Sequence, residues 1–462
     1  MSGWAAVLAV AALETAAGIG VLAALGVAGT PVEVARRLGL APLAGMALAG
    51  VLGALLAFAG ARLGLPGLVA LAAGALALGG ARLARRPRGT SPTRRPGRPG
   101  ARELAVLAVA AATILAVWVA AIAGIRDRPL AEWDGWAMWG MKARALALLG
   151  ADPAVFASPA YAHLHLEYPL LLPALHSLPL QAAEGYQSNT VLLSCLAIGL
   201  AGIAALWTGL AGRVRPVLLL PFLAAYVAAP AFFVQLATGY ADVPLAVFLS
   251  VGVACAARWL ARDRSAWLAL ATLFLAAAAL SKNEGLLFAA AAYTGLLAAG
   301  SGRRRAVLAS AGAVALACLP WRVFVEVHDL EAPDYRLADS LRLGWVLGRL
   351  DRAWTAGQEL VDAAVEPRRF GLLLALGVGA VAVAAALGAR RLALFGGTFF
   401  ALSSAGLLWV YVLTPYDLRY YLFTNAERVI VAPIFALAAL APLLVEETVR
   451  RLRAEELVAG RR

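Results

Sequence analysis

The chain has 462 residues, of which 62% are hydrophobic and only 15% are charged, and its mean hydropathy is +0.80. Soluble domains are nearer half apolar and a quarter charged, so this composition excludes an ordinary soluble enzyme, a disordered chain and a disulfide-rich secreted module. The formal charge of +13 would suggest a nucleic-acid partner in a soluble protein, so its distribution along the chain has to be examined first.

The apolar runs predict an all-α fold, a polytopic transmembrane helical bundle of about 13 spans. Each helix that crosses the hydrocarbon core of a bilayer needs roughly 20 apolar residues. The predicted spans are 4–28, 41–60, 64–81, 104–125, 190–211, 217–236, 243–259, 266–280, 286–300, 306–325, 370–388, 392–413 and 429–445.

Arginine sets the predicted orientation of these spans. The connection 82–103 is rich in Pro and Gly and carries eight arginines, which is typical of a cytoplasmic linker. Strict alternation then places the other arginine-rich connections and the tail 446–462 on the same side, and most acidic residues on the opposite side. The net charge therefore reports membrane orientation, and no nucleic-acid partner is needed to explain it.

This topology divides the chain into four parts and exposes four segments on the outer side. The parts are three N-terminal spans (1–81), the basic linker (82–103), a ten-span body (104–445) and the tail (446–462). The outer segments are 126–189, 237–243, 326–369 and 414–428, and the longer ones are expected to contain amphipathic juxtamembrane helices.

The first outer segment carries the first candidate catalytic residue. Asp134 lies between Trp133 and Trp136, and Lys142, one of only two lysines in the chain, follows. Trp133, Trp136 and Trp139 recur every three residues and would lie roughly along one side of a helix in the membrane interface, so a solvated acid in an aromatic belt is one interpretation. The other is a catalytic carboxylate among aromatic side chains that stack on a sugar.

The same segment contains a cluster of polar side chains. His163, His165 and Glu167 alternate and would share one side of an extended stretch, with Tyr168 next in sequence. A polar wall that binds substrate is one interpretation, and ligation of a divalent cation is the alternative.

A short outer segment and a predicted hairpin add further charges. Asp242 follows Tyr240 and precedes a predicted span, so it is either a helix cap or a second functional acid. The stretch 266–300 is apolar except for residues 281–285, which predicts a short helical hairpin with Lys282, Asn283 and Glu284 at its tip. Charges at this depth should be paired or functional, and Lys282 suits a lipid phosphate.

The last outer segment, 414–428, interleaves aromatic residues with Arg419, Asn425 and Arg428. Snorkelling arginines in an aromatic belt are one interpretation, and an anchor for a phosphate at the bilayer surface is the other. The acidic and amphipathic segment 326–369 is expected to cover the site.

The order and side of these motifs resemble the GT-C superfamily of polytopic membrane glycosyltransferases, which includes protein O-mannosyltransferases and bacterial enzymes that glycosylate lipid A or lipopolysaccharide. The motifs are EWDGWAMWGMKA (132–143), EYPLLLP (167–173), TGYADVP (238–244), SKNEG (281–285) and LRYYLFTNAER (418–428). The resemblance implies that Asp134 is the general base and Asp242 the second acid, with Lys282, Arg419 and Arg428 as donor-phosphate ligands. Gly135 departs from the pattern, because many relatives have a second acid there.

These features predict a glycosyltransferase of the bacterial plasma membrane, active at the extracytoplasmic face. Its partners would be a polyprenyl-phosphate-linked sugar donor, membrane lipids and a cell-envelope glycan, lipid or protein acceptor. The sequence identifies no cofactor with certainty, and a divalent cation is the one candidate. The alternative functions are a transporter or flippase of lipid-linked or small polar substrates, and a lipid-linked polymerase or ligase.

Overall fold

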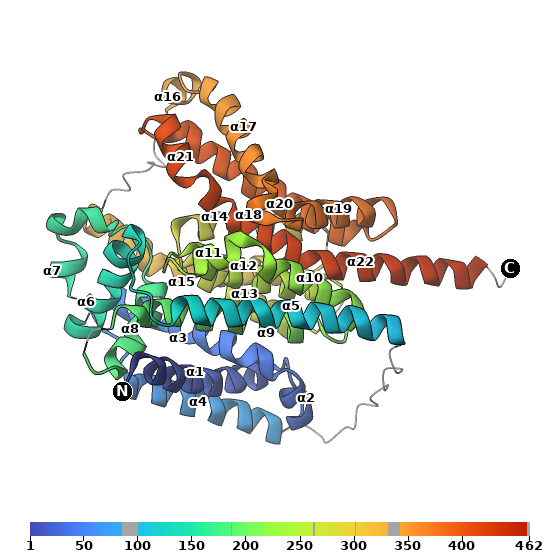
Figure 1. Ribbon diagram of the computed structural model, residues 1–462, viewed down its shortest axis with the longest axis horizontal. Helices are drawn as coiled ribbons and strands as arrows, with labels where there is room; N and C mark the ends of the chain where they lie inside the picture. Colours follow the sequence, from blue (N-terminus) through green and yellow to red (C-terminus); the bar gives the residue numbers. More distant parts are fainter. Residues whose placement is uncertain are drawn as a thin grey trace.

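The computed structural model describes residues 1–85, 100–150, 152–185, 187–261, 264–300, 302–330 and 342–459, and within these ranges the fold is helical without β-strands (Figure 1). The central part of the basic linker, 86–99, and residues 331–341 of the expected covering segment lie outside the described residues. The helices are α1 (Gly3–Leu25), α2 (Pro31–Arg36), η1 (Leu38–Leu40), α3 (Ala41–Phe58), α4 (Leu65–Ala84), α5 (Ala101–Ile125), η2 (Asp134–Gly140), α6 (Met141–Leu149), α7 (Pro153–Phe156), η3 (Pro159–Leu164), α8 (Leu171–Ala182), α9 (Asn189–Leu210), α10 (Pro216–Ala228), α11 (Pro230–Leu236), α12 (Asp242–Leu260), α13 (Ala266–Ala279), α14 (Asn283–Ala298), α15 (Arg304–Val327), α16 (Leu343–Leu347), α17 (Asp351–Val365), α18 (Pro367–Phe370), α19 (Leu373–Ala386), α20 (Arg390–Leu413), α21 (Leu418–Val429) and α22 (Val431–Ala459).

The lengths and hydropathies of these helices define a polytopic helical membrane protein, although they do not confirm 13 spans. Among the described residues, nine helices are long and apolar enough to cross a membrane. The predicted span 217–236 is a pair of helices, α10 and α11, bent by 54° where Pro230 begins the second helix. The predicted spans 266–280, 286–300 and 370–388 correspond to the shorter helices α13, α14 and α19, of 14, 16 and 14 residues.

Helix α12 forms the centre of the bundle. Each of its residues is buried, and it packs against α9, α13, α14 and α22. Helices α4 and α5 lie at the periphery, where only 17% of their apolar windows is buried. A helix that is apolar all round can be buried in protein or face lipid, and the chain uses both solutions.

The three N-terminal spans pack tightly on one another through glycine. A Cβ on Gly45 of α3 would collide with the carbonyl oxygen of Glu14, and one on Gly18 of α1 would collide with that of Ala41. Small residues allow this close backbone approach, which drives much helix association in lipid. Helices α1 and α3 also contact α8, α9 and α13, so the N-terminal spans share one core with the body.

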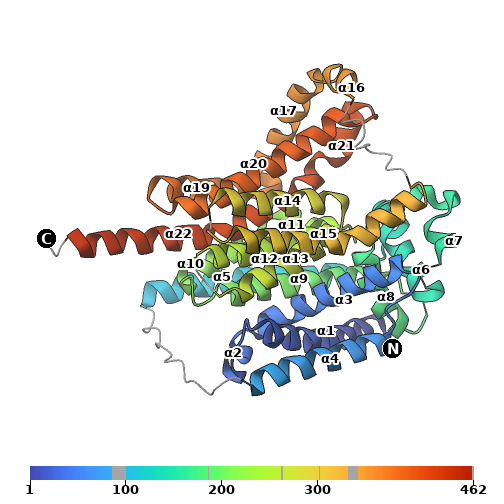
Figure 2. The same ribbon diagram turned by 180° about the vertical axis from the view of Figure 1, so that it is seen from behind.

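The two ends of the bundle differ in character. Helices α6, α7 and α8 gather at one end, which we call the outer end, whereas the C-terminus, α2 and the ends of α4 and α5 that adjoin the basic linker lie at the other (Figures 1 and 2). Helices α16, α17 and α21 project from the side of the bundle towards the outer end (Figure 2). The arginine-rich segments thus lie opposite the segments that carry the candidate site residues.

Candidate functional site

Five residues that the sequence singled out meet at the outer end. The Nη2 atom of Arg428 lies 2.6 Å from Oδ2 of Asp134 and 3.3 Å from Oδ2 of Asp242. The Nζ atom of Lys282 lies 2.9 Å from Oδ1 of Asp242 and 3.1 Å from Oε1 of Glu284. We call these five residues the charged cluster. It is a continuous chain of ion pairs in the order Asp134, Arg428, Asp242, Lys282 and Glu284.

Each member of the charged cluster stands at a helix end or break. Asp134 begins the π-helix η2, a form that is rare and concentrates at functional sites. Asp242 is the first residue of α12, but Ala241 is the N-cap residue and no side chain caps it, so the capping interpretation of Asp242 is wrong. Lys282 occupies the break between α13 and α14, as the predicted hairpin required, and Arg428 lies in the last turn of α21.

The members of the charged cluster differ in burial. The side chains of Asp242 and Lys282 are only 2% and 8% exposed, whereas that of Asp134 is 22% exposed. Burial would lower the pKa of Lys282, but the carboxylates of Asp242 and Glu284 outweigh burial and hold it above its ordinary value. The guanidinium of Arg428 also lies over the ring of Tyr240, 4.1 Å from its centroid. Of the two aspartates, Asp134 is therefore the one that is more accessible from outside the protein.

Gly135 explains how the first two outer segments meet. A Cβ at this position would collide with the backbone carbonyl oxygen of Thr238, in the segment that leads to Asp242. The missing side chain therefore allows η2 to pack directly on the second outer segment. This contact accounts for glycine at the position where the resembled family often has an acid.

We predict that Gly135→Ala destabilises the protein, by about 1–3 kcal/mol, because the new methyl group overpacks this contact. Thermal unfolding of the purified protein in detergent measures the effect as a lower Tm. Gly124→Ala is the matched control, since its Cβ would meet only Phe233 Cζ at 3.7 Å. Equal melting temperatures for the two variants would contradict the proposed packing.

The spacing predicts that the three tryptophans of the first outer segment lie on one side of a helix, but in the structure they do not. Trp133 and Trp136 are exposed and pair edge to face at 5.1 Å, whereas Trp139 is 1% exposed. A π-helix has more residues per turn than an α-helix, so within η2 Trp139 lies further round the helix from Trp136 than α-helical spacing predicts. Trp133 and Trp136 remain candidates for binding substrate, and Trp139 is a core residue.

Lys142 also points into the protein. Its ammonium donates a hydrogen bond to the backbone carbonyl of His165 and lies 5.5 Å from the ring centroid of Trp139 and 5.8 Å from that of Tyr168. The residue is 1% exposed, so these contacts hold α6 against residues 165–168 and leave little of Lys142 to contact a substrate. Burial lowers its pKa from 10.5 to about 7, against the attraction of Glu167.

This lowered pKa predicts a pH dependence of stability. Between about pH 7 and pH 10 the unfolded state binds more protons at Lys142 than the folded state, so the free energy of unfolding rises with pH in that window. Below about pH 7 both states are protonated and the dependence ends. We expect the Tm of the wild type to rise from about pH 7.5 to about pH 9.5 relative to that of Lys142→Met. Identical shifts in the two proteins would contradict the assignment.

The polar side chains that the sequence groups in the first outer segment have different surroundings in the structure. Nδ1 of His165 lies 3.0 Å from Oε1 of Glu167, and the indole Nε1 of Trp321 donates to the Glu167 carbonyl at 2.8 Å. Tyr168 is buried, and the side chain of His163 lies outside the described residues. In the part of the chain that the structure describes, no group of three His, Cys, Asp or Glu side chains is arranged to hold a metal ion.

Two predicted residues of the last outer segment lie away from the charged cluster. Arg419 is exposed near the start of α21, and Asn425 donates to the hydroxyl of its neighbour Thr424 at 3.0 Å. Only Arg428, at the end of that helix, reaches the two aspartates. The described part of the expected covering segment packs on α20 and α21, where Arg352 donates to the carbonyl of Thr414 at 2.8 Å.

A cavity of about 500 Å³ adjoins the charged cluster at Glu284. Helices α14, α15 and α20 form its walls, and we call it the side cavity. Its polar lining residues are Glu167, Asn283, Glu284, Arg322, Glu326 and Asp329. Its apolar and aromatic lining residues include Leu286, Leu287, Ala290, Trp321, Val325, Trp409, Val410 and Leu413.

The side cavity shows residues that sequence reasoning missed. Trp321, Arg322 and Trp409 fall inside predicted spans, where hydropathy indicates only lipid-crossing helices. One signal was present, because Arg322 is the only charged residue of the predicted span 306–325. Trp409 is 38% exposed, so the side cavity reaches the surface of the bundle.

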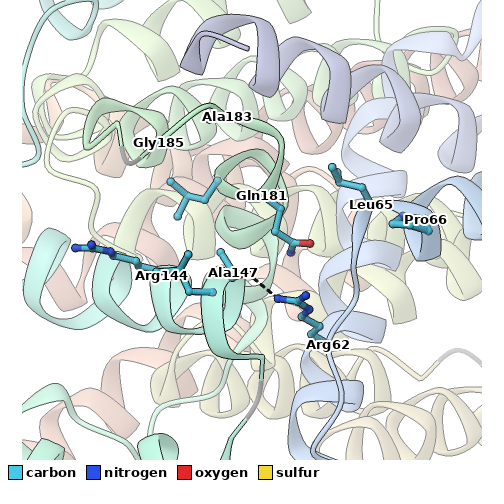
Figure 3. Close-up of a pocket in the computed structure, with 10 residues that line it drawn as sticks. Arg62, Leu65, Pro66, Arg144, Ala147, Gln181, Ala183 and Gly185 are labelled. Atoms are coloured by element: carbon cyan, nitrogen blue, oxygen red, sulfur yellow. Dashed lines mark hydrogen bonds between the residues drawn. The ribbon is translucent and has the colours of Figure 1, made fainter.

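A second cavity, of about 480 Å³, lies between the start of α4 and the helices α6 and α8 (Figure 3). Arg62 donates to the carbonyl of Ala147 at 2.7 Å, and Gln181 donates to that of Leu63 at 3.4 Å. The guanidinium groups of Arg62 and Arg144 lie apart in Figure 3, so they do not form a joint anion site. These contacts tie the N-terminal spans to the first outer segment.

Comparison of the chain with models of protein families, with curated proteins and with solved structures finds no match. The fold and the site thus define a helical membrane protein with a buried charged cluster and an adjoining side cavity at its outer end.

Proposed function

We propose that this protein is an integral-membrane glycosyltransferase of the bacterial plasma membrane. It transfers a sugar from a polyprenyl-phosphate-linked donor to an acceptor hydroxyl at the extracytoplasmic face. The acceptor is a glycan, lipid or protein of the cell envelope. The observation that carries the proposal is the pairing of Asp134 and Asp242 through Arg428, beside a cavity with a polar and an apolar lining.

The proposed reaction is a direct displacement. The acceptor oxygen attacks the anomeric carbon as its proton moves to the carboxylate of Asp134. The bond between the anomeric carbon and the phosphate oxygen breaks, and its electron pair leaves with the polyprenyl phosphate. One displacement inverts the anomeric centre, and nearby cations stabilise the charge that develops on the leaving phosphate.

The two aspartates suit different roles. Asp242 is 2% exposed and contacts two cations, so it is a positioning residue that holds Lys282 and Arg428 in place. Asp134 is more exposed, and its one ion-pair partner among the described residues is Arg428. A general base has to reach the proton it abstracts, and this requirement favours Asp134.

The depth of the charges favours an enzyme over a transporter. Transporters usually place their substrate site near the middle of the bilayer. Here the charged cluster joins helix ends at the outer end of the bundle, and its members come from four separate segments of the chain. That arrangement suits chemistry on a group presented at the membrane surface.

The proposal is tested with purified protein in lipid nanodiscs and a lipid extract that contains polyprenyl-phosphate sugars. Mass spectrometry follows each lipid-linked species over time. We expect one species to decline while free polyprenyl phosphate accumulates, and neither change with heat-inactivated protein. If no lipid-linked sugar is consumed in the presence of cell-envelope acceptors, the proposed function is wrong.

A further inference from the structure

The two cations of the charged cluster are already neutralised. Lys282 contacts the carboxylates of Asp242 and Glu284, and Arg428 contacts those of Asp134 and Asp242. Three carboxylates therefore surround two cations. A phosphate that approached this cluster would have to displace a buried carboxylate from its partner, which is costly. A ligand phosphate needs a cation elsewhere.

Arg322 supplies such a cation in the wall of the side cavity. It lies near the outer end of α15 and is exposed, and its guanidinium carbon is 5.2 Å from the ring centroid of Trp321. Among the described residues, no carboxylate lies within ion-pairing distance of Arg322. Its planar guanidinium can donate two hydrogen bonds to one phosphate.

The wall of the side cavity that α14 contributes presents hydrogen-bond acceptors instead of a cation. Oδ1 of Asn283 and Oε2 of Glu284 are buried and have no hydrogen-bond partner. Buried acceptors without a donor are costly, so a ligand whose hydroxyl or amine groups donate hydrogen bonds to these two atoms binds with higher affinity. A phosphate carries acceptor oxygens and would be repelled there. The apolar lining from Leu286 and Leu287 follows one turn further along α14.

We propose that Arg322 is the phosphate ligand of a polyprenyl-phosphate-linked donor held in the side cavity. The prenyl chain lies along the apolar lining of α14, α15 and α20, and the hydroxyl-bearing head group faces Asn283 and Glu284. Lys282 then serves as a positioning residue for Asp242 and Glu284. The identity of the donor rests on the proposed function, whereas the assignment of the phosphate site can be tested by binding alone.

The test measures binding of two probes to the purified protein in detergent. Geranylgeranyl phosphate carries the phosphate, and geranylgeraniol has the same chain without it. Trp321 and Trp409 line the side cavity, so their fluorescence reports occupancy by either probe. The variants are Arg322→Gln and, as a matched control, Arg305→Gln, an exposed arginine at the other end of the same helix.

We expect the wild type and Arg305→Gln to bind the phosphate probe roughly 10-fold or more tightly than the alcohol, the effect of a charged hydrogen bond. Arg322→Gln should lose this preference and keep the affinity for the alcohol. An undiminished phosphate preference in Arg322→Gln would overturn the inference, as would the absence of any preference in the wild type. Intact phosphate binding together with absent sugar transfer would instead count against the proposed function alone.

Discussion

Replacing Asp134 with Asn should lower the rate of sugar transfer by roughly 10²–10⁴-fold, the usual contribution of a general base. Asparagine keeps the shape of the side chain and can still accept a hydrogen bond from Arg428. It cannot take the proton of the acceptor hydroxyl. We therefore expect kcat to fall while the KM for the lipid-linked donor changes little, as initial rates in nanodiscs would show.

Asp127→Asn is the matched control for this variant. Asp127 precedes η2 in the same outer segment, and its side chain is 89% exposed beside Arg126. Its replacement should leave the transfer rate unchanged. If Asp134→Asn transfers sugar as fast as Asp127→Asn, then Asp134 is not the base.

Replacing Lys282 with Met should lower the free energy of unfolding by roughly 3–5 kcal/mol, because it leaves two buried carboxylates without their shared cation. Asp242 retains Arg428, but Glu284 has no other ion-pair partner among the described residues. Denaturant unfolding in detergent measures the loss.

The double variant Lys282→Met with Glu284→Gln separates lost charge balance from lost volume. It removes one cation and one carboxylate, so the charged cluster keeps its original net charge. We expect it to recover part of the lost stability. A single variant as stable as the wild type would show that the ion pairs of Lys282 contribute little to the fold.

Much of the site could be predicted because membrane topology restricts where charges can lie. Asp134 and Asp242 occur in separate outer segments and Lys282 at the tip of the predicted hairpin, and alternation of the spans places all three at one end. Their polar neighbourhoods in otherwise apolar sequence marked them as candidates. Their contacts with one another and with Arg428 match that expectation.

Other features depend on helix register and packing that the sequence alone does not specify. The π-helix turns Trp139 inward, and Lys142 is buried nearby, although spacing suggested one exposed aromatic face. Arg419 and Arg428 lie on one helix, yet only the second faces the aspartates. Arg322 lines the side cavity because α14 and α20 pack beside α15. The sequence pattern within one span does not show which helices are its neighbours.

The number of spans was difficult to predict for a similar reason. Helices α13 and α14 break at Lys282, and both are shorter than the roughly 20 residues that a full crossing needs. Burial inside the bundle allows such short helices, because neighbouring protein replaces lipid around their ends. Hydropathy alone counts them as spans without revealing that their junction lies beside Asp242.

Sealed liposomes that contain the purified protein and a labelled polyprenyl-phosphate sugar distinguish transfer of the sugar from transport of the lipid-linked sugar. Acceptor is supplied outside the liposomes, and the bond between sugar and phosphate is followed by mass spectrometry. We expect wild-type protein to break this bond, release polyprenyl phosphate and glycosylate the acceptor, and Asp134→Asn to do so far more slowly. Movement of the lipid-linked sugar across the bilayer with this bond intact would contradict the proposed glycosyltransferase function and identify a transporter.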